Sequence, residues 1–181
     1  PDYVVSQYFD WYASLAEKNV SNLNTTTYNL QNLSLLGFLQ RTGIYNNNSI
    51  VILIGLGLFA LPYLRIQQYK KLNFRLLLLA SVSIFLCLFS TGTENSTYVI
   101  AYVGIGVWFV VSKLPIKLKI VLLVLAILAS LSPTDIFKPL KESYIIRYSL
   151  RAVPPTLIWL AIVYEMCFLE FKNNENNRNN S

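Results

Sequence analysis

The sequence contains no histidine. Any mechanism that needs an imidazole base or an imidazole metal ligand among these residues is therefore excluded. Charged residues are also scarce, at 13% of the 181 residues, whereas soluble domains carry about 25%. The two cysteines, Cys87 and Cys167, both lie within apolar runs. We expect them to pack as small hydrophobic side chains rather than to form a disulfide framework or a metal site.

Glycine is present, but not in a loop of the kind that binds phosphate. Gly55 and Gly57 form one pair and Gly104 and Gly106 another, and both pairs lie inside apolar runs. In such runs glycine typically permits close helix packing, so a nucleotide-sugar site of the soluble type is unsupported. The first residue is Pro1, the one methionine is Met166, and no signal peptide precedes the first run. We expect the chain to be the carboxy-terminal part of a longer protein.

What the chain does have is five apolar runs with short polar stretches between them. The runs are centred on Ile50–Leu64, Leu76–Phe89, Thr97–Val111, Leu118–Leu131 and Leu150–Leu169. A bilayer core about 30 Å thick needs roughly 20 mostly apolar residues in a helix, and each run approaches that length with its small and hydroxylated flanks. The sequence therefore predicts an all-α multi-pass membrane protein, with a bundle of about five transmembrane helices in residues 50–171. Pro62 is expected to mark the end of the first.

Residues 1–49 differ from the rest, and we expect them to form an outer-side segment with interfacial or short helices. Aromatic and polar residues alternate in residues 3–16, which favours an interfacial helix because Tyr and Trp prefer the headgroup level. The Asn-, Thr- and Ser-rich residues 19–32 predict a loop, and the apolar spacing in residues 32–41 predicts a short helix. The Asn-rich residues 172–181 are expected to be a disordered tail.

Basic residues predict how the runs are oriented. They crowd two short loops, one with Arg65, Lys70, Lys71 and Arg75 and the other with Lys113, Lys117 and Lys119. The positive-inside rule places both loops in the cytoplasm. Residues 1–49, 90–96 and 132–149 then lie on the outer side of the cell (inner) membrane, although the last of these loops carries basic residues of its own. Because the basic residues lie between apolar runs, the net charge of +6 indicates membrane loops and not a nucleic-acid surface.

The outer side collects the unusual polar residues. Asn32, Ser34 and Arg41 lie close together in one short segment. The guanidinium of Arg41 is a planar fork of donors that suits phosphate or carboxylate. Spacing alone nevertheless favours a solvated arginine that pairs with lipid headgroups.

Two carboxylates lie near the ends of apolar runs. Glu94 is the one charge in the polar hairpin of residues 90–98, where it could orient sugar hydroxyls, transfer a proton or be a solvated turn residue. Glu165 lies near the inner end of the last run, where a carboxylate reaches the interface more cheaply than at the bilayer centre, and we interpret it as structural. Pro154 and Pro155 permit either a kink or a helix start in the same run.

At these segments the sequence resembles glycosyltransferase family 87. Residues 32–37, followed by Arg41, are similar to the Asn-Gln-Ser-Leu-x-Gly…Arg segment of that family. Three further groups of residues look like the version in Bacteroidetes members: 89–98 with Gly104 and Trp108, 131–137, and 144–148 with 152–154. The resemblance runs over most of residues 3–165. Members of the family are multi-pass GT-C enzymes, represented by the polyprenol-phosphate-mannose-dependent mannosyltransferases of mycobacteria.

The resemblance implies a membrane enzyme that transfers a hexosyl or mannosyl group on the outer face of the membrane. The donor would be a polyprenyl-phosphate sugar and the acceptor a glycolipid or glycan, with no cofactor, metal or nucleic acid. The substrate site would be formed by Asn32, Ser34, Arg41, Glu94, Ser96, Thr97 and Arg151. The donor phosphate would meet Arg41 or Arg151, and acceptor hydroxyls would face Glu94 and Asn32. Glu94 is a candidate contributor to catalysis, and the catalytic aspartate would precede residue 1.

The chain departs from the family pattern at one place, and three other classes of membrane protein are alternatives. Actinobacterial members of the family carry histidines around the position of Ser96 and Thr97, and this chain has none. A transporter or flippase for lipid-linked glycans is an alternative, but transporters place ionisable groups near mid-membrane, whereas the charges here lie at the ends of the runs. A non-catalytic membrane subunit is another alternative. An O-antigen polymerase or ligase would be expected to have an outer loop richer in arginine.

Overall fold

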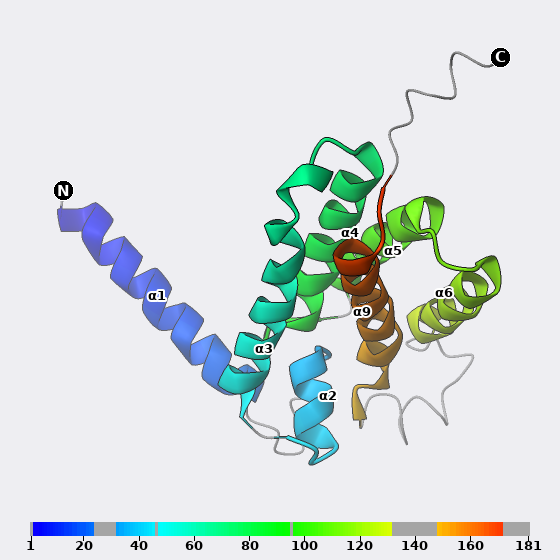
Figure 1. The fold of residues 1–181 in the computed structure, drawn as a ribbon. Coiled ribbons are helices and arrows are strands. Elements are labelled where there is room, and N and C mark those ends of the chain that lie inside the picture. The colour runs from blue at the N-terminus through cyan, green and yellow to red at the C-terminus, as the bar shows by residue number, and fades with distance from the viewer. Residues whose placement is uncertain (1, 24–31, 46, 95, 132–147, 172–181) are drawn as a thin grey trace, which may run out of the picture.

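The computed structural model describes residues 2–23, 32–45, 47–94, 96–131 and 148–171. Throughout these residues the regular structure is entirely helical, which confirms the predicted all-α class (Figure 1). The α-helices are α1 (Asp2–Leu23), α2 (Leu35–Arg41), α3 (Asn48–Ala60), α4 (Leu72–Leu88), α5 (Tyr98–Val111), α6 (Ile116–Leu131) and α9 (Val153–Phe168). Short 3-10 helices are η1 (Leu61–Leu64), η2 (Ile66–Gln68) and η5 (Leu150–Ala152).

The core lies where α4, α5 and α9 pack together. Large side chains from all three helices are fully buried there, among them Phe74 from α4, Trp108 from α5 and Trp159 from α9. The indole Nε1 of Trp159 donates a hydrogen bond to Ser81 Oγ at 3.1 Å, which ties α9 to α4. Figure 1 shows α2 at one end of this bundle and the turn between α3 and α4 at the opposite end.

The predicted role of the paired glycines holds for one member of each pair. A Cβ on Gly104 would lie 2.9 Å from the backbone oxygen of Ala80, so glycine allows α5 to approach α4 closely. A Cβ on Gly55 would lie 2.2 Å from the ring of Phe89. Gly57 and Gly106 have nothing within 4 Å of that position, so the packing prediction is wrong for them.

Prolines fix two helix boundaries. Pro62 lies in η1, directly after the end of α3, as predicted. Pro154 and Pro155 occupy the first turn of α9, where the missing backbone N–H groups have no intrahelical acceptor to lose. The sequence leaves open whether these two prolines kink a helix or begin one. The structure shows that they begin α9.

Glu165 joins three segments at the end of the bundle far from α2. Its carboxylate is fully buried. It accepts hydrogen bonds from Trp108 Nε1 at 3.0 Å, Ser112 Oγ at 2.7 Å and the backbone N–H of Lys113 at 2.8 Å. The structural interpretation of Glu165 is thus confirmed. The sequence suggested that its carboxylate reaches the membrane interface, whereas the structure shows it bonded to donors of the protein.

The first helix, α1, is longer than the sequence predicts and projects from the bundle (Figure 1). It continues to Leu23, so the predicted loop is wrong for residues 19–23, and residues 24–31 lie outside the described part. The predicted tail, residues 172–181, lies outside it as well. Between residues 3 and 20 every side chain of α1 is exposed. Near its end, Asn19 Oδ1 accepts a 2.7 Å hydrogen bond from Thr91 Oγ1.

One helical stretch in the described residues is long and apolar enough to cross a membrane by length and composition. It is Leu150–Phe168, with 19 residues. The apolar helices Asn48–Leu64, Leu72–Leu88 and Tyr98–Val111 are shorter. The 14 residues of α5 rise about 21 Å at 1.5 Å each, which is less than a hydrocarbon core of about 30 Å.

The outward faces of these helices are nonetheless apolar. Leu53 of α3 is 69% exposed, Leu79 of α4 is 57% exposed, Val110 of α5 is 80% exposed and Val121 of α6 is 56% exposed. Many of their neighbours are similarly exposed. Large exposed apolar patches are unusual on soluble monomers and typically mark surfaces that contact protein or lipid.

We predict that Glu165→Ala destabilises the protein by about 3 kcal/mol or more, because it leaves three buried donors without an acceptor. Unfolding in detergent, followed by circular dichroism, measures the change. Glu170→Ala is the matched control, since Glu170 is exposed and its described hydrogen bond uses its backbone oxygen. Equal stability of the two variants would contradict the structural role of Glu165.

Candidate functional site

A polar cluster lies at the end of the bundle where α2, η5 and the start of α5 meet. It consists of Asn32, Ser34, Arg41, Ser149 and Arg151. Hydrogen bonds between neighbouring residues explain the arrangement of Asn32 and Ser34. Asn32 Oδ1 accepts hydrogen bonds from Ser34 N at 3.1 Å and Ser34 Oγ at 2.6 Å. Ser34 Oγ accepts in turn from the backbone N–H of Gly37 at 3.3 Å, so Ser34 is the N-cap of α2.

Gly37 allows α2 to pack directly against the Asn32 turn. A Cβ at this position would lie 2.3 Å from the backbone oxygen of Asn32. Since that contact is with backbone, a larger residue would push the turn away from the helix. Glycine is therefore needed here for the cluster to close.

Arg41 and Ser149 connect segments that are far apart in the sequence. Arg41 Nη1 donates a hydrogen bond of 2.5 Å to Ser149 Oγ, which donates one of 3.1 Å to the backbone oxygen of Asn32. Ser149 has a φ of 50°, a left-handed conformation that is uncommon for a residue with a Cβ. Burial lowers the pKa of the Arg41 guanidinium because desolvation disfavours its charge. An arginine nevertheless keeps its proton in proteins, so the cluster contains a fixed cation.

Arg151 supplies a second cation to the cluster. It is 6% exposed, and its Cζ lies 4.5 Å from the ring centroid of Tyr98 and 5.9 Å from that of Tyr102. Stacking on aromatic faces stabilises a guanidinium that is withdrawn from water. The hydroxyl of Tyr98 donates to the backbone oxygen of Leu33 at 2.6 Å, which fixes the ring beside the Asn32 turn.

Four of the seven predicted substrate-site residues thus lie in one cluster: Asn32, Ser34, Arg41 and Arg151. The other three belong to the neighbouring loop, where Glu94 and Ser96 are exposed and Thr97 is half-buried. That loop abuts the cluster, because the backbone oxygen of Thr93 accepts a 3.0 Å bond from the N–H of Leu33. The Glu94 carboxylate faces Lys18 of α1 at 4.0 Å.

Sequence reasoning did not single out Ser149, Tyr98 or Tyr102 as members of the site. Ser149 carries no local signal, because glycine is the usual residue in its backbone conformation. A tyrosine at the start of an apolar run has the position of an ordinary interfacial aromatic. Their roles arise from contacts across the fold, which the spacing of residues does not encode.

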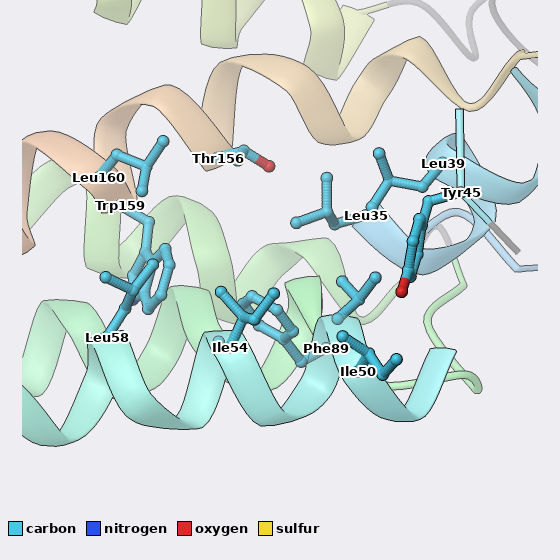
Figure 2. A pocket seen from close by; sticks show the side chains of 12 residues that line it. Leu35, Leu39, Tyr45, Ile50, Ile54, Leu58, Phe89, Thr156, Trp159 and Leu160 are labelled. Carbon is cyan, nitrogen blue, oxygen red and sulfur yellow. The ribbon is translucent and has the colours of Figure 1, made fainter. Parts of the chain in front are cut away.

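An apolar pocket of about 360 Å³ opens between α2, α3 and α9 (Figure 2). It is lined by Leu35, Leu39, Tyr45, Ile50, Val51, Ile54, Gly55, Leu58, Phe89, Thr156, Trp159 and Leu160. The hydroxyl of Thr156 is already donated to the backbone oxygen of Ala152 at 2.7 Å. The lining therefore offers hydrocarbon and aromatic surface, which suits an apolar chain or ring.

The pocket and the cluster are adjacent along the chain. Leu39 lines the pocket two positions before Arg41 on α2, and Thr156 lines it soon after Arg151 on the segment that leads into α9. Both therefore draw on α2 and on the segment that leads into α9. Over the described ranges, no group of three or more metal-ligating side chains is found.

Comparisons of the chain with protein-family models, with curated proteins and with solved structures give no match.

We predict that Tyr98→Phe destabilises the protein by about 1–3 kcal/mol, because the buried oxygen of Leu33 loses its donor. Tyr102→Phe is the matched control. The Tyr102 hydroxyl is buried and finds no hydrogen-bond partner among the described residues, so its removal should leave stability unchanged or slightly higher. Thermal unfolding of both variants in the same detergent decides the matter. A larger loss in Tyr102→Phe than in Tyr98→Phe would contradict the hydrogen-bonding scheme of the cluster.

Proposed function

We propose that this chain belongs to a membrane glycosyltransferase that takes a hexosyl group, such as mannose, from a polyprenyl-phosphate carrier. The acceptor is a glycolipid or glycan on the outer face of the membrane. The observation that carries the proposal is the apolar pocket beside the cationic cluster of Arg41 and Arg151. The resemblance of residues 32–41 and 89–98 to glycosyltransferase family 87 supports the same conclusion.

A multi-pass arrangement in the cell membrane is part of this proposal. Support comes from the apolar outward faces of α3, α4, α5 and α6. A bilayer would cover these faces with hydrocarbon and so remove them from water. Apart from Leu150–Phe168, the described apolar helices are short for a full crossing, but a bilayer can thin locally around short apolar helices for fractions of a kcal/mol per Å. The polar cluster then faces the outer side and the basic loops face the cytoplasm.

The polar cluster suits a phosphate and the first sugar of the carrier. Guanidinium groups bind phosphate oxygens through charge-assisted hydrogen bonds, and both arginines lie where the low local dielectric strengthens such bonds. The amide Nδ2 of Asn32 is buried and has no hydrogen-bond partner in the described part of the chain. A ligand oxygen would satisfy this donor. The acceptor proton would be taken by a carboxylate outside residues 1–181, as the family resemblance implies.

A carrier-binding subunit without catalytic activity is the second candidate. It is favoured by one observation, namely that the exposed Glu94 carboxylate faces Lys18 at 4.0 Å. This carboxylate therefore faces a charge of the protein itself. Such a subunit would bind the same donor lipid through the same pocket and cluster.

We predict that Arg41→Ala lowers kcat/KM for the donor roughly 10- to 100-fold, the effect of losing one charge-assisted hydrogen bond of about 1.5–3 kcal/mol. Sugar transfer from polyprenyl-phosphate mannose by the intact protein in liposomes is the measurement. Glu94→Gln should lower kcat if Glu94 contributes to the reaction. Glu17→Gln, which removes an exposed charge of α1 that forms no ion pair within the described residues, is the control. Unchanged rates in both Arg41→Ala and Glu94→Gln would exclude these roles for the two residues.

We predict that Ile54→Trp narrows the apolar pocket and removes much of the preference for a long-chain donor over a short-chain analogue. Excluding two methylene groups, at about 0.8 kcal/mol each, changes that preference roughly tenfold. Leu53→Trp is the matched control, because Leu53 precedes Ile54 on α3, is 69% exposed and does not line the pocket. If the two variants change the chain-length preference equally, the pocket is not the site of the donor lipid.

A further inference from the structure

The end of the bundle opposite the polar cluster carries a second charged surface, which the proposed reaction does not use. Direct contacts bring its parts together. Arg65 Nη1 donates to the backbone oxygens of Met166 and Leu169 at 2.9 and 2.7 Å. The rings of Phe74 and Phe171 lie 5.6 Å apart. The turn before α4, the end of α9 and the loop between α5 and α6 therefore meet at one end (Figure 1).

Some of the cations at this end are already engaged within the protein. Lys119 Nζ donates to the backbone oxygens of Phe109 and Ser112 at 3.0 and 3.1 Å. Lys113 Nζ donates to the backbone oxygen of Glu170 and lies 4.5 Å from the ring centroid of Phe171. These groups, like Arg65, close the ends of helices and are part of the fold.

Lys70, Lys71, Arg75 and Lys117, here called the basic end, are different. Lys70, Arg75 and Lys117 are exposed and Lys71 is half-buried, and none forms an ion pair with another residue that the structure describes. The nearby carboxylates do not neutralise these cations. Glu165 is buried and accepts hydrogen bonds from other groups, and Glu170 forms no ion pair within the described residues. Within the described residues, the basic end therefore carries positive charge that no ion pair compensates.

The helices at this end add to the positive potential. Both α4 and α6 begin here, and neither has an acidic residue in its first turn. A helix N-terminus carries a partial positive charge, so a cation in the first turn is unfavourable there and an anion is favourable. The chain places Arg75 and Lys117 in just these turns. The cations would be stabilised by an anion that lies over the surface.

The surroundings of the basic end indicate what kind of anion that is. Leu64, Ile66, Leu72 and Ile116 are 77%, 74%, 52% and 56% exposed and lie in the same loops as the cations. Cations that border exposed aliphatic side chains match the boundary between phosphate headgroups and hydrocarbon.

We propose that the basic end binds the phosphate headgroups of anionic phospholipids in the cytoplasmic leaflet. The proposal rests on the membrane arrangement of the proposed function, but it assigns a ligand to the opposite end of the bundle from the donor site. The lipid phosphates neutralise Lys70, Lys71, Arg75 and Lys117, and their acyl chains cover the adjoining apolar side chains. Binding of this kind is electrostatic and weakens as salt rises.

The test uses the intact protein in nanodiscs of mixed phosphatidylglycerol and phosphatidylcholine, with the lipids retained after release into detergent counted by native mass spectrometry. The variant combines Lys70→Gln, Lys71→Gln, Arg75→Gln and Lys117→Gln. Since each juxtamembrane cation contributes up to roughly a fivefold preference for anionic lipid, we expect the enrichment of phosphatidylglycerol to fall at least tenfold. The control, Lys18→Gln, should leave it unchanged. An unaltered enrichment in the quadruple variant would overturn the proposal.

A second measurement separates this proposal from the proposed function. Cysteines introduced as Lys70→Cys and Glu94→Cys are labelled in intact cells with a reagent that does not cross the membrane. Labelling of Glu94→Cys alone supports the arrangement on which both proposals depend, and labelling of both positions overturns both. If the sides are as expected and sugar transfer persists while lipid enrichment is unaltered, the headgroup site alone is wrong.

Discussion

The rest of the structure depends on one constraint, which is that its outward faces are apolar and its polar groups must find partners inside the protein. A buried charge without partners costs several kcal/mol, and each buried charged residue here is accordingly surrounded by donors or aromatic faces. Glu165 accepts from Trp108, Ser112 and Lys113 at one end. Arg151 stacks on Tyr98 at the other. These contacts hold together helices that apolar packing alone would leave free to slide.

The two ends consequently differ in chemistry. At one, a carboxylate is enclosed and the unsatisfied cations point outward, whereas at the other Arg41 and Arg151 are drawn inward beside an apolar pocket. Exposed cations on a surface attract anions of many kinds. Cations that are buried beside a hydrocarbon-lined cavity instead select a ligand with both an anionic and an apolar part. This contrast is why we assign the reacting lipid to the cluster and the bulk lipid headgroups to the basic end.

The sequence predicted the helices of the bundle well and the site only in outline. Apolar runs locate α3 to α6 and α9, because a helix buried in protein or in lipid needs the same apolar side chains. Pro62 and Pro155 mark helix boundaries through local backbone geometry, which the sequence shows directly. The extension of α1 to Leu23 was missed, since Asn and Ser favour loops only weakly. The resemblance brought Asn32 and Arg41 together, but their link through Ser149 spans more than a hundred positions. No local pattern could have encoded a contact of that kind.

The three tryptophans happen to report on three separate parts of this molecule. Trp11 is 61% exposed on α1, Trp108 is enclosed beside the Glu165 carboxylate, and Trp159 is 1% exposed while its ring forms part of the pocket wall. Indole emission depends on the polarity around the ring, so each should emit at its own wavelength. Occupation of the cavity by an apolar chain would change the surroundings of the Trp159 ring, which gives the protein a built-in optical signal of whether the cavity is filled.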